Sequence, residues 1–316
     1  MRRPAMTSRL LPRLSPETVP YVLLSPFVLL FLVFGVFPLG FSFFLAFQSW
    51  EPTAGLFSMK FVGLDNFAFA IGDEWFWKSL KNTAWLALAA GVPQHVVAIP
   101  LAYFIHTSFK RTRNAVIGAY FLPYITSTVA IAMMFGTLFS TDFGLINVAL
   151  HALDGVPGLG WLAPAAPIDW LGRAENVKPA ISLVVFWRYV GFNTVLYLAA
   201  LQTIPNDIYE AATMDGAGRW QQFWFITLPN LQPMIYFGVT LSVIGGLQLF
   251  EEPFILTGGR GGSDQAGMTT AMYMYRTAFE FNDFGGASAL SWLLFVFVAL
   301  LTWLTNRAFK PRGPAR

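Results

Sequence analysis

The chain of 316 residues is 55% hydrophobic and only 12% charged, which leaves too little charge to cover a soluble protein of this length. Its net charge of +3 does not indicate nucleic-acid binding, because the basic residues lie beside long apolar segments. The chain has no cysteine, so disulfides, thiol catalysis and thiolate metal sites are excluded.

Apolar residues gather into six runs, each long enough to cross a bilayer, which takes about 20 residues in a helix. Pro and Gly interrupt several runs, which membrane helices tolerate because neighbouring groups satisfy the freed backbone atoms. The runs are continuous rather than alternating, so they predict an all-α bundle of six transmembrane helices and not a β-barrel. In chain order they are Tyr21–Phe47, Thr83–Ile105, Ala115–Phe139, Ala180–Leu201, Met234–Phe250 and Ala287–Asn306.

The first run is too long for the core of a signal peptide and lacks a small-residue cleavage pattern, so we expect it to remain as a span. The tail before it, residues 1–20, is basic, and so are the connection after the second run and the C-terminal tail. Basic residues collect on the cytoplasmic side of membrane proteins. Both termini are therefore predicted to be cytoplasmic, in agreement with an even number of spans.

The second run contains Gln94 and His95 directly after a proline. A proton relay would need several ionisable groups within the membrane, and only His95 lies well inside this run. We therefore interpret the two residues as a polar packing site. Metal binding is not indicated, because His95, His106 and His151 have no ligand spacing among them.

The fourth run carries a polar stripe. Tyr189, Asn193 and Tyr197 follow one another at every fourth position, so they share one helix face. Such a stripe offers stacking and hydrogen bonds to a solute with apolar faces and hydroxyl edges, while packing against another helix explains it equally well. Arg188 lies elsewhere on this helix, and snorkelling or pairing with an acid on a neighbouring span is favoured over solute contact.

The fifth run ends in further polar residues. Gln248 is a candidate to bind solute hydroxyls, near the outer part of the run. Glu251 and Glu252 follow at its mouth, where we expect them to mark the water interface.

The connection between the fourth and fifth runs, residues 203–232, carries helix signals. A helix is expected to begin at Pro205, with acidic residues in its first turn, and Gly216 permits a sharp turn after it. A second short amphipathic stretch follows over Trp220–Ile226 and is closed by Leu228–Pro229. Two short helices joined by a glycine turn form a compact loop suited to docking in a groove of another protein.

This loop also carries a sequence signature, which resembles the EAA motif of permeases from binding-protein-dependent ABC importers. The matching residues are Glu210, Ala211 and Ala212, then Gly216, then Ile226, Thr227, Leu228 and Pro229. Further stretches are similar to the carbohydrate-uptake branch of maltose, lactose and glycerol-phosphate-type permeases, namely Leu24–Pro26, Phe61–Phe67, Lys81–Thr83, Leu256–Gly259 and Tyr273–Phe279.

The resemblance implies a machine of several subunits in the bacterial inner membrane. Two permease subunits, usually different, form the path; two ATPase subunits hold ATP and Mg²⁺; and an extracytoplasmic binding protein delivers the solute. Glu210 would contact a basic residue in the ATPase groove. Ala211, Ala212 and Gly216 would allow close packing and the turn, and Ile226, Leu228 and Pro229 would complete the coupling motif.

Taken together, these features predict one multi-pass permease domain over residues 1–316. The chain lacks a phosphate loop of the form G-x-x-x-x-G-K-[ST], so it is not expected to hydrolyse ATP, and no bound cofactor is expected. An ion-coupled secondary transporter would need inverted repeats and clustered buried ionisable groups, and a membrane enzyme would need a nucleophile or metal site. The resemblance favours a sugar or sugar-like solute, with glycerol phosphate or another polyol as the alternative.

Overall fold

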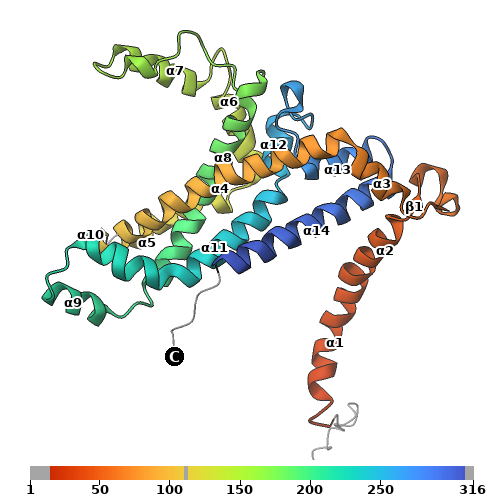
Figure 1. Ribbon diagram of the computed structural model, residues 1–316, viewed down its shortest axis with the longest axis horizontal. Coiled ribbons are helices and arrows are strands. Elements are labelled where there is room, and N and C mark those ends of the chain that lie inside the picture. Colours follow the sequence, from red (N-terminus) through yellow and green to blue (C-terminus); the bar gives the residue numbers. More distant parts are fainter. Residues whose placement is uncertain (1–14, 110–112, 310–316) are drawn as a thin grey trace, which may run out of the picture.

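The computed structural model describes residues 15–109 and 113–309 and is almost entirely helical (Figure 1). The basic tail predicted over residues 1–20 and the basic C-terminal tail therefore lie largely outside the described residues. A short antiparallel hairpin, β1 (Gln48–Ser49) with β2 (Lys60–Phe61), follows the first span. The expectation of a helical membrane protein is confirmed.

Within residues 15–109 and 113–309, five helical segments are long and apolar enough to span a membrane, and a sixth arises if one bent pair counts as a single span. These five segments contain α1 (Val19–Phe31) with α2 (Phe37–Leu45), α4 (Glu74–Ser108), α8 (Ala174–Leu201), α10 (Arg219–Gln222) with α11 (Leu228–Leu247) and α12 (Glu251–Leu256), and α14 (Phe284–Phe309). Shorter helices lie between them: α3 (Asp65–Gly72), α7 (Leu145–Ala152), α9 (Asn206–Met214) and α13 (Thr270–Phe279).

The bent pair corrects the expectation of one straight span over Ala115–Phe139. This run forms α5 (Arg113–Ile125) and α6 (Thr128–Leu138), which meet at 90°. Pro123 removes a backbone donor in the last turn of α5, and Ser127 is extended. The Thr126 hydroxyl bonds back to the Leu122 carbonyl, which further favours a break over continuation of the helix.

Helix α4 is the centre of the bundle, because it contributes to all three buried apolar clusters. The first cluster joins α4 to α6, α8 and α12. The second joins it to α3, α11 and α14, and the third joins it to α5, α8 and α11. In Figure 1, α4, α11 and α14 run side by side along the body. Helix α4 begins at Glu74, earlier than the predicted run, because Asp73 caps it by accepting from the Trp75 amide at 3.0 Å.

The first span stands apart from this body (Figure 1). None of its most apolar window is buried within the chain. An apolar surface of this extent is stable in lipid or against another subunit, and not in water. The span therefore supports the membrane location independently of the core.

Helices α5 and α8 approach each other closely at Gly191. A Cβ atom at Gly191 would lie only 1.7 Å from the Tyr120 carbonyl oxygen, so only glycine allows these backbones to approach.

We expect Gly191→Ala to destabilise the purified protein in detergent by about 1–3 kcal/mol, because α5 must move away from α8. Thermal unfolding measures the effect. Gly118→Ala on α5 is the matched control, since its added methyl group would meet nothing within 4 Å. Equal midpoints for the two variants would show that the contact is looser than described.

Candidate functional site

A cavity of about 210 Å³ lies between α4, α5, α8 and α11. Small residues leave the space open, with Gly91 on α4 and Gly245 and Gly246 on α11. The polar and aromatic side chains that line the cavity are Gln94, Tyr124, Tyr189, Phe192, Asn193 and Ser242. Two members of the predicted stripe, Tyr189 and Asn193, thus lie at one cavity.

Hydrogen bonds and ring contacts hold the cavity wall in place. The Asn193 amide donates to Gln94 Oε1 at 3.3 Å, and the Gln94 amide donates to the Val185 carbonyl at 3.3 Å. The Tyr124 ring stacks on Phe192 with centroids 4.5 Å apart. These contacts come from three helices, so they fix the wall without filling the cavity.

Tyr197 lies away from this cavity, although it shares a helix face with Tyr189. Its side chain is fully buried, and its hydroxyl lies 2.6 Å from His95 Nδ1. His95 Nε2 in turn lies 3.0 Å from Ser242 Oγ. A Cβ at Gly238 would lie 2.7 Å from the Tyr197 hydroxyl oxygen, so the ring packs directly on the α11 backbone. The geometry around Tyr197 and His95 is that of interhelical packing.

A buried ion pair lies behind the cavity. Arg188 Nη1 and Glu252 Oε1 are 2.6 Å apart, and their side chains are 12% and 3% exposed. The expectation that Glu252 marks the water interface is therefore wrong. Helix α11 ends at Leu247, and the turn that follows directs α12 inward against α8, so the carboxylate meets the charge on α8.

The ion pair also supports one side chain of the cavity. The Arg188 guanidinium lies 5.3 Å from the centroid of the Tyr189 ring, within range of a cation–π contact. Tyr124 contacts the same ring edge-on, with centroids 5.8 Å apart. Arg188 thus pairs with an acid on a neighbouring helix and also contacts the Tyr189 ring that lines the cavity.

Gln248, the remaining candidate for solute binding, is separated from this cavity. It lines a second cavity of about 520 Å³ between α11, α13 and α14, together with Ser291 and Thr302. The sequence spacing placed Gln248 near the end of the fifth span but did not indicate which neighbours it would face.

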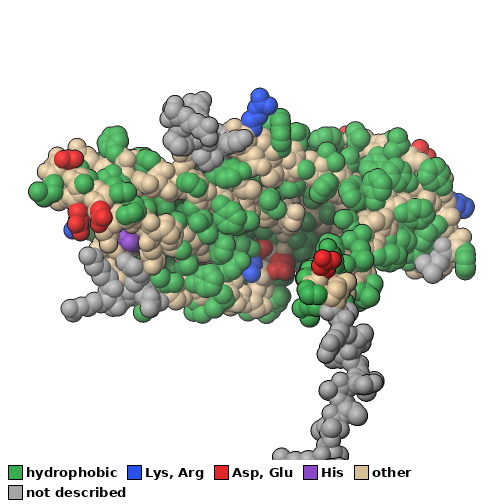
Figure 2. Space-filling view, turned by 90° about the horizontal axis from the view of Figure 1, so that it is seen from below, with side chains coloured by type: hydrophobic (Ala, Val, Ile, Leu, Met, Phe, Trp, Pro, Cys, Tyr) green, Lys and Arg blue, Asp and Glu red, His purple; other side chains and the backbone are tan. Residues whose placement is uncertain are grey.

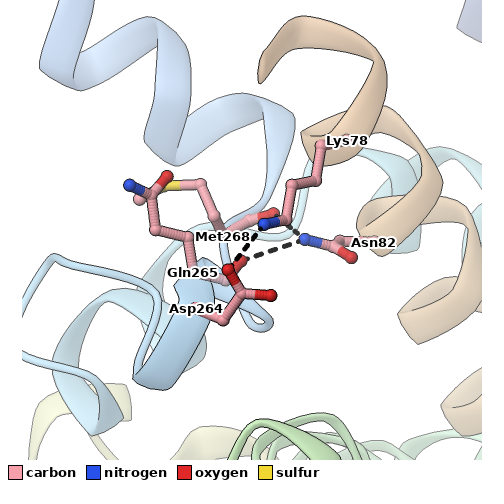
Figure 3. A network of polar contacts seen from close by, with 5 residues as sticks. All are labelled: Lys78, Asn82, Asp264, Gln265 and Met268. Carbon is pink, nitrogen blue, oxygen red and sulfur yellow. Dashed lines mark hydrogen bonds and ion pairs between the residues drawn. The ribbon is translucent and has the colours of Figure 1, made fainter. Parts of the chain in front are cut away.

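The segment between α12 and α13 is tied to α4 by polar contacts that the sequence did not reveal (Figure 3). Lys78 pairs with Asp264 at 3.1 Å, and the Asn82 amide donates to the carbonyls of Gln265 and Met268 at 3.2 and 3.1 Å. Asp264 and Gln265 both have positive φ, a conformation that costs free energy for non-glycine residues and is held here by these contacts.

Helix α13 is anchored on α4 in the same region. The Thr270 amide donates to Thr83 Oγ1 at 2.9 Å, and the Tyr273 hydroxyl donates to the Asp73 carboxylate. Burial and this hydrogen bond raise the pKa of Tyr273. Tyr273 therefore remains a neutral donor at physiological pH.

The loop over residues 203–232 contains the predicted glycine turn, with Gly216 at a φ of +81°. Helix α9 precedes the turn and has no buried residue. The expected closure of a second short helix at Leu228–Pro229 is wrong, because α10 continues through a π-helical turn (Phe223–Thr227) into α11. Proline suits the first turn of a helix, and the wider π turn accommodates its missing backbone donor.

Two contacts hold α9 against the start of this long helix. The Tyr209 hydroxyl lies 3.0 Å from Thr227 Oγ1, and the Gln222 amide donates to Thr213 Oγ1 at 3.0 Å. Of the signature residues, Glu210, Ala211, Gly216 and Pro229 are exposed, Ala212, Ile226 and Leu228 are half-buried, and Thr227 is buried. Helix α9 lies at one end of the bundle (Figure 1).

We expect Glu252→Gln to destabilise the protein by about 3–5 kcal/mol, because it leaves the Arg188 charge buried without its partner. Thermal unfolding in detergent measures the loss, and the double variant Arg188→Met with Glu252→Gln should recover most of it. Asp264→Asn is the control, since its pair with Lys78 is exposed and should contribute less than about 1 kcal/mol. Equal losses for the two single variants would contradict a buried pair.

Comparison with known proteins agrees with this architecture. Residues 94–312 match the family of binding-protein-dependent transport system inner membrane components. The arabinooligosaccharide transport permease AraP of Halalkalibacterium halodurans is 33% identical over 94% of this chain and 90% of its own length. The lactose transport permease LacF of Rhizobium radiobacter is 34% identical over 92% of this chain and 94% of its own length.

A solved structure extends the likeness to three dimensions. A chain of the bacterial alginate ABC transporter, in complex with an alginate pentasaccharide-bound periplasmic protein, superposes with a TM-score of 0.74. The two chains are 25% identical, and the superposition covers 92% of this chain and 93% of the other. The chain therefore belongs to the family of binding-protein-dependent transport system inner membrane components, as the signature between α8 and α11 implies.

Proposed function

We propose that this chain is one permease subunit of an ATP-driven importer for a sugar or sugar-like solute, in the bacterial inner membrane. It crosses the membrane six times, with the bent pair α5–α6 as one span and both termini in the cytoplasm. A second permease subunit, two ATPase subunits and an extracytoplasmic binding protein complete the importer. ATP and Mg²⁺ bind to the ATPase subunits.

The cavity between α4, α5, α8 and α11 carries the proposal. Its aromatic rings offer apolar faces for a sugar ring, while its amide groups offer donors and acceptors for hydroxyl groups. Gln94 and Asn193 each keep hydrogen-bonding capacity beyond the contacts they make with protein. Relatives named for arabinooligosaccharide and lactose transport support a sugar over a polyol.

The connection between the coupling loop and this cavity supports an ATP-driven mechanism. Helix α9 is bonded to the start of α11, and α11 continues to Ser242 and Gly245 in the cavity wall. A displacement of α9 by the ATPase subunits would therefore tilt the helix that lines the solute cavity. An ion-coupled carrier has no use for such a docking loop.

If the solute passes this cavity, Asn193→Leu should lower sugar uptake about tenfold, because about 1.4 kcal/mol of hydrogen bonding to the solute is lost. Uptake of radiolabelled sugar into proteoliposomes that contain the complete importer, with saturating binding protein, measures the effect. Gln248→Leu is the matched control, because Gln248 lines a different cavity and its loss should leave uptake unchanged. A defect at position 248 alone would move the path to the cavity between α11, α13 and α14.

We expect Glu210→Ala to abolish most of the ATP hydrolysis that loaded binding protein stimulates, because α9 loses its charged contact with the ATPase groove. Asp207→Ala is the matched control, since Asp207 is also exposed on α9 but lies outside the signature. The purified importer in nanodiscs gives both rates. Normal stimulation in the Glu210 variant would remove Glu210 from the coupling contact.

A further inference from the structure

A groove of about 520 Å³ runs between α4 and the segment formed by α10, the π turn and the start of α11. Its walls are apolar side chains from both elements, namely Val96, Ile99, Pro100, Phe223, Trp224 and Leu228. Val96 and Trp224 are 65% and 45% exposed, so the groove opens to the surroundings of the chain.

The groove is distinct from the solute cavity. Gln94 lines the solute cavity and His95, the next residue, lines the groove, so the two spaces lie on different sides of α4. His95 is bonded through both ring nitrogens, to Tyr197 and to Ser242. Among the described residues, those at the inner end of the groove therefore offer no free polar atom, which suits an apolar occupant and not a sugar.

The other end of the groove carries a positive charge. Arg219 is exposed there, and the Tyr103 hydroxyl donates to its backbone carbonyl at 3.2 Å, which holds the backbone and leaves the guanidinium without a partner among residues 15–109 and 113–309. Trp220 is 71% exposed beside it and packs edge-on against Trp224 with centroids 5.6 Å apart. Tryptophan beside a basic residue at a helix end is typical of the headgroup level of a membrane.

The length of the groove suits a lipid chain. From His95 to Tyr103 the α4 backbone advances about 12 Å, at about 1.5 Å per residue. An apolar slot of this length with a cation at its mouth matches an acyl chain that runs inward from a negatively charged headgroup. Both the apolar groove and Arg219 are needed for this agreement with a bound lipid.

We propose that the groove binds an anionic phospholipid, with one acyl chain between α4 and the π turn and the phosphate at Arg219. This inference rests on the proposed orientation, in which the end of the bundle with α9 and α10 faces the cytoplasmic leaflet, where anionic lipids attract basic residues. The bound lipid would pack against the turn that joins the coupling loop to α11.

Photo-crosslinking of the complete importer tests the proposal. The purified importer is placed in phosphatidylcholine nanodiscs with a trace of phosphatidylglycerol or phosphatidylcholine that carries a diazirine in its acyl chain. After illumination, lipid adducts are mapped by mass spectrometry. We expect the phosphatidylglycerol probe to label residues 96–103 and 219–228 preferentially, and unlabelled phosphatidylglycerol, but not soluble glycerol phosphate, to compete.

Arg219→Gln should lower this preferential labelling about fivefold, since one basic residue near the membrane surface contributes about that factor. Arg307→Gln is the matched control, because Arg307 is also exposed, lies 5.6 Å from the ring centroid of Trp303 and belongs to α14, away from the groove. Equal labelling by the two lipid probes, or no effect of Arg219→Gln, would overturn the proposal.

A second measurement identifies any other occupant of the groove. Benzoylphenylalanine is placed at position 96 in the intact importer and illuminated in native membranes. A phospholipid adduct supports the proposal, whereas a crosslink to a partner subunit would assign the groove to the subunit interface and overturn it. Because neither experiment uses solute or ATP, failure here leaves the proposed transport function unaffected, and failure of transport leaves the lipid site standing.

Discussion

Inside a bilayer a polar side chain finds no water, so it must find its partner on another helix. This requirement determines how the bundle is assembled around α4 and α8. Gln94 bonds to Asn193, His95 links α8 to α11, and Arg188 on α8 pairs with Glu252 on α12. Each contact selects which helix faces meet, which apolar packing alone would specify weakly because lipid is equally apolar. The cavity between α4, α5, α8 and α11 lies among these contacts, so the groups that hold the bundle together also give the cavity its polar wall.

The membrane spans were predictable from the sequence because hydropathy over about 20 residues depends on the bilayer and not on tertiary neighbours. The sharp turn between α9 and α10 was predictable for a similar reason, since it depends on the local backbone freedom of Gly216. The break between α5 and α6 was not predictable from the sequence. A proline such as Pro123 can either bend or end a membrane helix, and the neighbouring helices decide whether the helix bends or ends.

Within the predicted polar stripe, spacing established that Tyr189 and Tyr197 share a face but could not establish what that face meets. The two residues are two turns apart, and over that distance the neighbours of α8 change from an open cavity to the closely packed backbone of α11. The prediction that Glu252 marks the water interface failed for a related reason. Its burial depends on the direction in which the chain leaves α11, and three residues outside any helix determine that direction. Spacing within one helix therefore predicts faces, while contacts between helices need the whole fold.

The π turn over Phe223–Thr227 determines how α9 and α10 are rotated relative to the cavity between α4, α5, α8 and α11. A π turn holds one residue more than an α turn, and each residue rotates a helix by about 100°. Loss of a single residue here would keep the long helix continuous but would turn α10, and with it α9, by about a quarter of a revolution relative to the cavity. In the proposed importer the ATPase subunits would then push α11 in a different direction. The extra residue of the π turn therefore sets the rotation of α9 relative to the cavity, and we expect a chain that is one residue shorter at this point to fold but not to couple ATP hydrolysis to transport.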